Sequence, residues 1–411
     1  MAGQGSGVAR RAAVLLLTLL GLSGLLAGCV TPSAPADSAP GEIQRLLDRR
    51  ARAVLDHDPA GYVAEFAPGA TAAATAARRE YDRLADVPFA SWTYRVTDVD
   101  RTGEGRAVAE AELGYRIKGH DSGPVTSPRE LELTERDGRW FVTAERNGKG
   151  AAQQLWQQGD VDVVRGTRSL VLGVGQSAQR LRDIASAADR AVPAVSAAWP
   201  RPWARRVVIL APASLDAMGR LLGAPAAGYR GIAAVTTGET GGGPDAPADR
   251  VIVNPDAYGV LGTFGRQVVL THETTHVATR AHTSASTPMW LSEGFADWAA
   301  YRDGGRTAAQ TAPELHRAVQ AGAFSGRLPD DDAFAFAGDA DALARAYESG
   351  WLACELIAQT WGEQRLADFY AAVAAHPGRD GAVEKALHDV LSTTPEDFTA
   401  RWRAHVTERL G

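Results

Sequence analysis

The stretch HETTH places two histidines and a glutamate, His272, Glu273 and His276, within five residues. The surrounding residues from Gly265 to Thr279 have helical spacing, so the two histidines lie on one face, one turn apart. Two imidazoles at that separation can bind one tetrahedral zinc ion, with Glu273 beside the open coordination position. Zinc lowers the pKa of a bound water, and a neighbouring carboxylate can accept the water's proton as it attacks a carbonyl group. The pattern therefore predicts zinc-dependent hydrolysis.

A second helical stretch supplies acidic residues that such a site needs. A catalytic zinc site uses three protein ligands, whereas a structural site closes the coordination shell with a fourth. Between Thr287 and Gly305, Glu293 and Asp297 stand four residues apart and share one helix face. One of these carboxylates can ligate zinc while the other orients a ligand imidazole through a hydrogen bond.

The two motifs together resemble those of a known family. HETTH followed by WLSEGFADW is similar to the gluzincin metallopeptidases, the superfamily of thermolysin and alanyl aminopeptidase. The resemblance implies Zn²⁺ as cofactor, with His272, His276 and Glu293 as its ligands. It also implies that Glu273 is the general base and that Asp297 supports a ligand from behind.

A donor for the developing oxyanion is also expected. Tyr347 lies in AYESGWLACELIAQTWG, which resembles the helix that carries a catalytic tyrosine in a Tyr-x-Lys-Gly pattern in alanyl-aminopeptidase relatives, although Ser349 stands in place of the lysine. A phenol stays protonated at neutral pH and can donate a hydrogen bond. The alternatives are that Tyr347 only packs at a helix edge, and that His282 is the donor.

The resemblance also bears on the substrate. Gluzincins hold a peptide against an edge strand by main-chain hydrogen bonds, and the stretch from Gly228 to Val235 is the candidate for that strand. The Gly-x-Met-Glu-Asn motif of the aminopeptidase branch has no match, although Glu239 lies nearby. We therefore predict an endopeptidase, with an aminopeptidase as the alternative.

Length and pattern predict the fold that positions these residues. The chain has 411 residues and a net charge of −6, which suits two domains and gives no sign of nucleic-acid binding. Residues 43–150 read as helices followed by alternating strands, an α+β arrangement of helices on a curved antiparallel sheet. This segment resembles the cone-shaped SnoaL-like domain of the nuclear transport factor 2 superfamily. For residues 151–411 we expect a gluzincin-type domain, a mixed sheet with the HExxH helix, and a helical C-terminal subdomain.

The N-terminus has the pattern of a bacterial lipoprotein signal. Arg10 and Arg11 precede an apolar run that ends in LAGC, which resembles a lipobox. Residues 1–28 would then be removed, Cys29 would carry lipid, and the Pro- and Ser-rich residues 29–42 would form a flexible linker. The alternative is a transmembrane anchor. Cys354 is then the single remaining cysteine, and its helical context predicts a buried apolar position.

These features together predict a membrane-anchored, extracytoplasmic zinc peptidase that acts on a peptide or protein substrate. The alternative is a catalytically degenerate binding lipoprotein with a peptidase-like fold, in which the N-terminal cone domain supplies recognition. The presence of Glu273 between the two histidines favours the enzyme, because a binding protein has no need of a general base.

Overall fold

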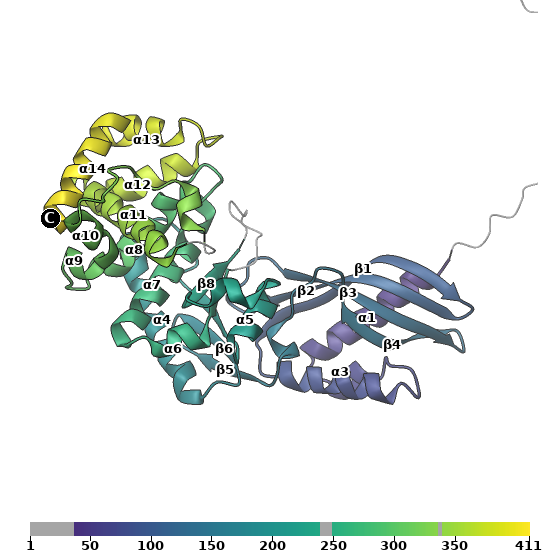
Figure 1. The fold of residues 1–411 in the computed structure, drawn as a ribbon. Coiled ribbons are helices and arrows are strands. Elements are labelled where there is room, and N and C mark those ends of the chain that lie inside the picture. The colour runs from purple at the N-terminus through teal and green to yellow at the C-terminus, as the bar shows by residue number, and fades with distance from the viewer. Residues whose placement is uncertain (1–36, 239–248, 336–338) are drawn as a thin grey trace, which may run out of the picture. The chain divides into compact units, whose positions relative to one another are not determined.

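The computed structural model describes residues 37–238, 249–335 and 339–411. The predicted α+β class is confirmed, because helices accompany one antiparallel sheet and one mixed sheet and then form the C-terminal part of the chain (Figure 1). None of the helices among the described residues combines the length and the hydropathy that crossing a bilayer requires. Cys29 and Glu239 lie outside the described residues.

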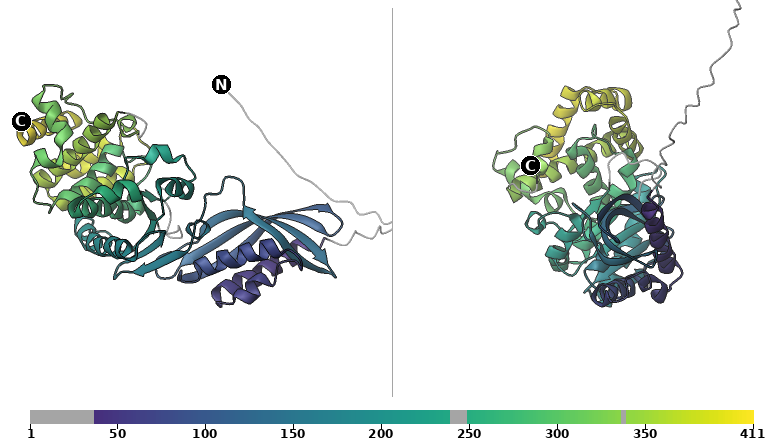
Figure 2. Two further views of the ribbon diagram at one scale, coloured as in Figure 1. Left: turned by 60° about the horizontal axis from the view of Figure 1, so that its bottom comes forward. Right: turned by 90° about the vertical axis from the view of Figure 1, so that its right-hand side faces the viewer.

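The first part of the chain is an antiparallel sheet with strand order β1-β2-β3-β4. Helix α1 packs along strand β1, and the left view of Figure 2 shows the purple N-terminal helices on one face of the curved blue sheet. Alternating burial along the strands directs apolar side chains towards these helices. The elements are α1 (Ala39–Leu55), α2 (Pro59–Val63), α3 (Thr71–Leu84), β1 (Phe89–Gly103), β2 (Arg106–Ile117), β3 (Val125–Arg136) and β4 (Arg139–Asn147). Helix α1 therefore begins inside the segment predicted as linker.

The second sheet has strand order β5-β6-β7-β9-β8. Its three central strands are parallel and almost fully buried, and an antiparallel strand closes each edge. The strands are β5 (Val161–Arg165), β6 (Ser169–Val174), β7 (Val207–Ala211), β8 (Ala234–Thr237) and β9 (Arg250–Val253). The edge strand is therefore β8, which begins at Ala234, later in the sequence than the strand predicted at Gly228 to Val235. A 3₁₀ helix, η2 (Ala226–Tyr229), follows Pro225, and pairing with β9 starts only at Ala234.

The two sheets share apolar contacts across residue 150. Trp156, in the short 3₁₀ helix η1 (Leu155–Gln157), packs against Trp92 and Tyr115 of the first sheet, and belongs to the same buried cluster as Leu170 of β6. An ion pair adds a polar link, because Arg250 at the start of β9 donates to both carboxylate oxygens of Asp121 at 2.8 Å.

Helices flank the second sheet and then continue to the C-terminus. Helix α7 (Thr263–Thr279) carries the HETTH motif and packs between α4 (Ala178–Ala198) and α8 (Met289–Tyr301), while α11 (Ala340–Trp361) packs on α8. The remaining helical elements are α5 (Leu215–Leu222), α6 (Pro255–Val260), η3 (Arg280–His282), α9 (Ala308–Thr311), α10 (Pro313–Gln320), η4 (Asp331–Phe334), α12 (Glu363–Ala374), α13 (Ala382–Leu391) and α14 (Pro395–Leu410).

Two glycines allow α8 and α11 to approach each other closely. A Cβ atom at Gly294 of α8 would overlap the backbone of Gly350 of α11, and one at Gly350 would lie 2.5 Å from the carbonyl oxygen of Trp290. Cys354, one turn further along α11, is fully buried as predicted. Backbones can pack at this distance only where neither residue has a side chain, so the crossing point is fixed by these two residues.

We expect Gly350→Ala to destabilise the protein. The added methyl group must displace α8 from α11, and overpacking of this kind costs about 1–3 kcal/mol of unfolding free energy. Denaturant unfolding measures the change. The matched control is Gly265→Ala in α7, where the new Cβ would meet only Leu261, at 3.4 Å; there the better helix propensity of alanine should leave stability unchanged or increased. Equal losses in both variants would contradict the close-packing argument.

Candidate metal centre

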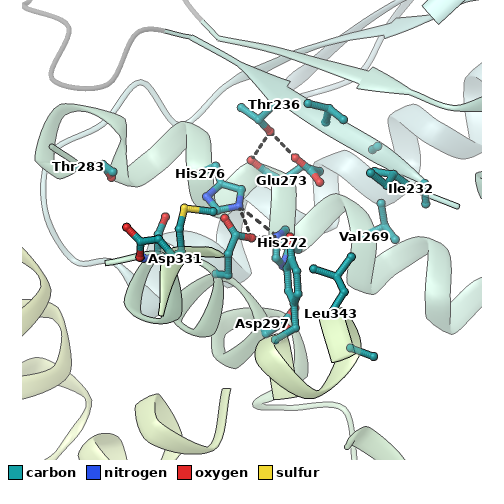
Figure 3. Close-up of a pocket in the computed structure, with 18 of the residues that line it drawn as sticks. Ile232, Thr236, Val269, His272, Glu273, His276, Thr283, Asp297, Asp331 and Leu343 are labelled. Carbon is teal, nitrogen blue, oxygen red and sulfur yellow. Dashed lines mark hydrogen bonds and ion pairs between the residues drawn. The ribbon is translucent and has the colours of Figure 1, made fainter. Parts of the chain in front are cut away.

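Three of the predicted ligands converge on one point between helices α7 and α8. The Nε2 atoms of His272 and His276 are 3.1 Å apart, and Oε2 of Glu293 lies 3.2 Å from the first and 3.4 Å from the second (Figure 3). Ligands at about 2.0–2.1 Å around a tetrahedral ion stand about 3.3 Å from one another. The three donor atoms therefore have the spacing of one face of a zinc tetrahedron, and the fourth position is left to a non-protein ligand. Within the described residues, this is the group of side chains suited to holding a metal ion.

The imidazole of His272 is oriented by a hydrogen bond at Nδ1, the ring nitrogen that faces away from His276 and Glu293. Its Nδ1 atom lies 2.8 Å from Oδ1 of Asp297, one turn beyond Glu293 on α8. A carboxylate in this position accepts a hydrogen bond from Nδ1–H, which leaves the Nε2 lone pair free to bind a metal ion. Glu293 and Asp297 therefore lie where the resemblance predicts the ligand and the supporting carboxylate, respectively.

The charges around this group also suit a cation. Burial opposes protonation of His272, but the charge of Asp297 and its hydrogen bond, together with Glu293, raise the pKa of His272 well above its usual value. Burial favours the neutral form of Glu293, but His276 and His272 outweigh it and lower the pKa of this carboxyl below its usual range. The site thus stabilises positive charge beside an ionised carboxylate, and a metal ion can replace the proton.

Glu273 lies on the other side of the two histidines from Asp297, and it faces the edge of the second sheet (Figure 3). The hydroxyl of Thr236, on strand β8, donates to Oε2 of Glu273 at 2.6 Å and also lies 3.1 Å from its backbone carbonyl oxygen (Figure 3). The carboxylate is therefore fixed between α7 and β8 and largely buried. The sequence does not identify Thr236 as a site residue, because a single threonine in a strand belongs to no motif and to no periodic pattern.

The two candidate oxyanion donors occupy different places. The ring of Tyr347, on α11, lies 6.2 Å from that of His272, and the residue lines the same cavity. Burial raises the pKa of Tyr347 well above its usual value, and the nearby carboxylates of Glu293, Asp297 and Glu273 raise it further, so its hydroxyl remains a donor. His282 is not among the residues that line the cavity; its ring packs against Trp199 instead.

The histidines, Glu273 and Tyr347 all face a cavity of about 990 Å³. One wall is β8 and the segment before it, and the opposite wall is formed by α8 and α11. In Figure 3, apolar side chains gather on one side of His272, whereas Thr283 and Asp331 lie on the other side. A cavity of this size can hold several residues of an extended chain.

Comparisons with known proteins supply no function. No model of a known protein family matches the chain, and no curated protein matches its sequence. Among the solved structures that match part of the chain is Rv3472, a protein of unknown function from Mycobacterium tuberculosis. It is 18% identical, covers 28% of this chain and 76% of that chain, and has a TM-score of 0.23. A match at that TM-score identifies neither fold nor function, so the functional interpretation depends on the geometry of the site.

His272→Ala should remove most bound zinc, because it deletes one ligand and leaves Asp297 without its partner. Metal analysis after dialysis against dilute zinc, with equilibrium unfolding to confirm the fold, measures this. The matched control is His282→Ala, which removes a histidine outside the cavity and should keep zinc at one equivalent. Stoichiometric zinc in His272→Ala would place the metal elsewhere.

Proposed function

We propose that this protein is a zinc-dependent peptidase that hydrolyses peptide bonds within chains. The observation that carries the proposal is the tetrahedral spacing of the donor atoms of His272, His276 and Glu293, with Glu273 beside them in an open cavity. Zinc held there supplies a Lewis acid that polarises a carbonyl group and lowers the pKa of water.

Glu273 has the position of a general base. It follows His272 directly on α7, so its carboxylate flanks the ligand set without joining it. The Thr236 hydroxyl occupies one of its oxygens at 2.6 Å, which fixes the orientation of the carboxylate and directs the other oxygen to receive a proton from an attacking water. Proton transfer to a positioned carboxylate contributes about two to four orders of magnitude in rate.

Tyr347 is the group proposed to stabilise the oxyanion. It approaches the ligands from α11, across the cavity from β8, and its raised pKa keeps the hydroxyl protonated. A hydroxyl aimed at the developing negative charge stabilises the transition state more than the substrate. Its role is separate from that of Glu273, since one accepts a proton and the other only donates a hydrogen bond.

The edge of the second sheet favours a peptide as the substrate. Strand β8 pairs with β9 on one side only, and residues Gly231 to Thr236 line the cavity. An unpaired strand edge presents backbone N–H and C=O groups at the spacing that an extended peptide matches. Recognition through the backbone suits cleavage within a chain, because it requires no chain terminus.

The location of the protein is also a proposal. The lipobox-like LAGC and the apolar run before it favour a chain tethered by lipid on Cys29 to the outer face of the cell membrane. Its substrates would then be peptides or proteins outside the cytoplasm.

Glu273→Gln should keep zinc and peptide affinity but lower kcat by about two to four orders of magnitude, because the amide cannot accept the water's proton. A peptide-library digest of the wild-type protein first identifies a substrate. Zinc content, peptide affinity and kcat are then measured for the wild type, for Glu273→Gln and for the control Glu384→Gln, which makes the same change on the exposed surface of α13. Full activity in Glu273→Gln would refute the mechanism. A wild-type protein that binds zinc and peptide but cleaves nothing would instead be a binding lipoprotein with a peptidase-like fold.

Tyr347→Phe removes one hydroxyl and should lower kcat by about two to three orders of magnitude with little change in KM. His282→Ala, the rival position, should retain wild-type kcat because its ring lies against Trp199. Steady-state kinetics on the same peptide compare the two variants. The opposite ranking would assign the donor role to His282.

A further inference from the structure

A second pocket, of about 270 Å³, lies beside the turn between β5 and β6 and the amino-terminal ends of β6 and β7. Four separate segments meet there: the end of β5 with the turn into β6, the residue before β7, the connection after β2, and the residue before β1. The lining residues are Pro88, Lys118, His120, Arg165, Gly166, Thr167, Arg168, Ser169, Leu170 and Arg206. None of them belongs to the metal centre.

The lining is strongly basic. Lys118, Arg165, Arg168 and Arg206 contribute four positive charges and His120 an imidazole, while no aspartate or glutamate lines the pocket. Within the described residues, none of the four cations forms an ion pair, although most ion pairs elsewhere in the chain involve arginine. The whole chain carries a net charge of −6, so the local positive charge of this pocket is opposite in sign to the net charge of the protein.

Two of the arginines are held by backbone carbonyl groups rather than by carboxylates. Arg165 donates to the carbonyl oxygen of Asp86 at 3.2 Å, and Arg206 donates to that of Gly119 at 3.4 Å. Carbonyl groups orient a guanidinium without neutralising it, and each guanidinium keeps further N–H groups for another acceptor. All four cationic side chains are exposed, so their charged ends remain available to an anion from solution.

Three carboxylates lie near the pocket without lining it, and Asp86, next to Arg165, has an exposed side chain. Asp189, behind the turn, accepts hydrogen bonds from the backbone N–H groups of Thr167 and Arg168 and from the hydroxyl of Ser169. Asp121, next to His120, is paired with Arg250. Burial lowers the pKa of His120; the carbonyl oxygen of Lys118, 3.2 Å from its Nδ1 atom, opposes this shift, and Arg206 adds to it. The lining of the pocket is therefore positively charged and includes no carboxylate.

We propose that this pocket binds a phosphate group. Arginine guanidinium groups present paired N–H donors that match phosphate oxygens, and lysine adds a point charge. Several converging cations suit a phosphate better than a single carboxylate, because a monoester carries up to two negative charges. The volume is slightly below the about 300 Å³ at which pockets for drug-sized ligands begin, so a small phosphorylated group fits.

The phosphate belongs to a soluble phosphate ester or to a phospholipid headgroup. Both present anionic phosphoryl oxygens, but a monoester carries up to two negative charges and a headgroup diester carries one. The proposal is independent of the peptidase function, because the pocket and the cavity share no lining residue.

Isothermal titration of the full-length protein in neutral detergent tests the proposal. The probes are inorganic phosphate, the soluble headgroup diester glycerophosphoglycerol, and a hexaglutamate peptide, each at low and high salt. The test variant is Lys118→Ser with Arg206→Ser. The matched control is Arg79→Ser with Arg182→Ser, two exposed arginines on helices α3 and α4 that lie outside the pocket.

Phosphate binding that weakens at high salt, as screening requires, and falls at least about tenfold in the test variant but not in the control, would support the proposal. The diester then identifies the source: binding equal to or tighter than inorganic phosphate indicates a lipid headgroup, and binding of inorganic phosphate alone indicates a soluble ester. Absence of phosphate and diester binding, or equal loss in both variants, would overturn it. Tighter binding of hexaglutamate than of either phosphate probe would overturn it in favour of an acidic protein partner.

As a second readout, the pKa of His120 measured by NMR should rise when phosphate binds, because a bound anion offsets the charge of Arg206. An unchanged pKa at saturating phosphate would place the bound ion elsewhere.

Discussion

Helices α8 and α11 cross at Gly294 and Gly350, and the geometry of the metal centre depends on this contact. Glu293 immediately precedes Gly294, and Tyr347 lies one turn before Gly350. A side chain at either glycine would force the two helices apart. The absence of two Cβ atoms therefore sets the distance between the proposed metal ligand Glu293 and the proposed oxyanion donor Tyr347, while the packing of α7 on α8 brings the histidines to the same point.

The mixed sheet borders both the cavity and the basic pocket. Its parallel strands β6, β7 and β9 are buried, and among the described residues β5 and β8 are the edge strands. At β8 the free edge borders the cavity, and Thr236 connects the sheet to Glu273. The basic pocket lies beside the β5–β6 turn and the start of β6. One sheet thus positions two candidate sites that share no lining residue, so each can be altered without the other.

Much of the fold and most of the candidate site could be predicted from local patterns. Helical spacing correctly indicated α7 and α8, and the i, i+4 rule placed His272 beside His276 and Glu293 beside Asp297 because such pairs depend on the helix alone. The edge strand begins later than predicted, because a 3₁₀ helix follows Pro225 and β8 begins only where it pairs with β9. Thr236 escaped prediction because its importance arises from a contact between elements 37 residues apart.

The sequence by itself determined the chemical groups and their local spacing: two imidazoles and a carboxylate on one helix, two carboxylates on the next, and a tyrosine on a third. Helix periodicity alone left open which of Glu293 and Asp297 faces the two histidines, although the family resemblance implied Glu293. The tertiary structure places Glu293 Oε2 next to both Nε2 atoms and Asp297 at Nδ1 of His272. It also placed Tyr347 in the cavity and His282 against Trp199. The physical reason is that periodicity fixes where a side chain points relative to its own helix axis. The packing of one helix against another, here through Gly294 and Gly350, fixes what that side chain meets.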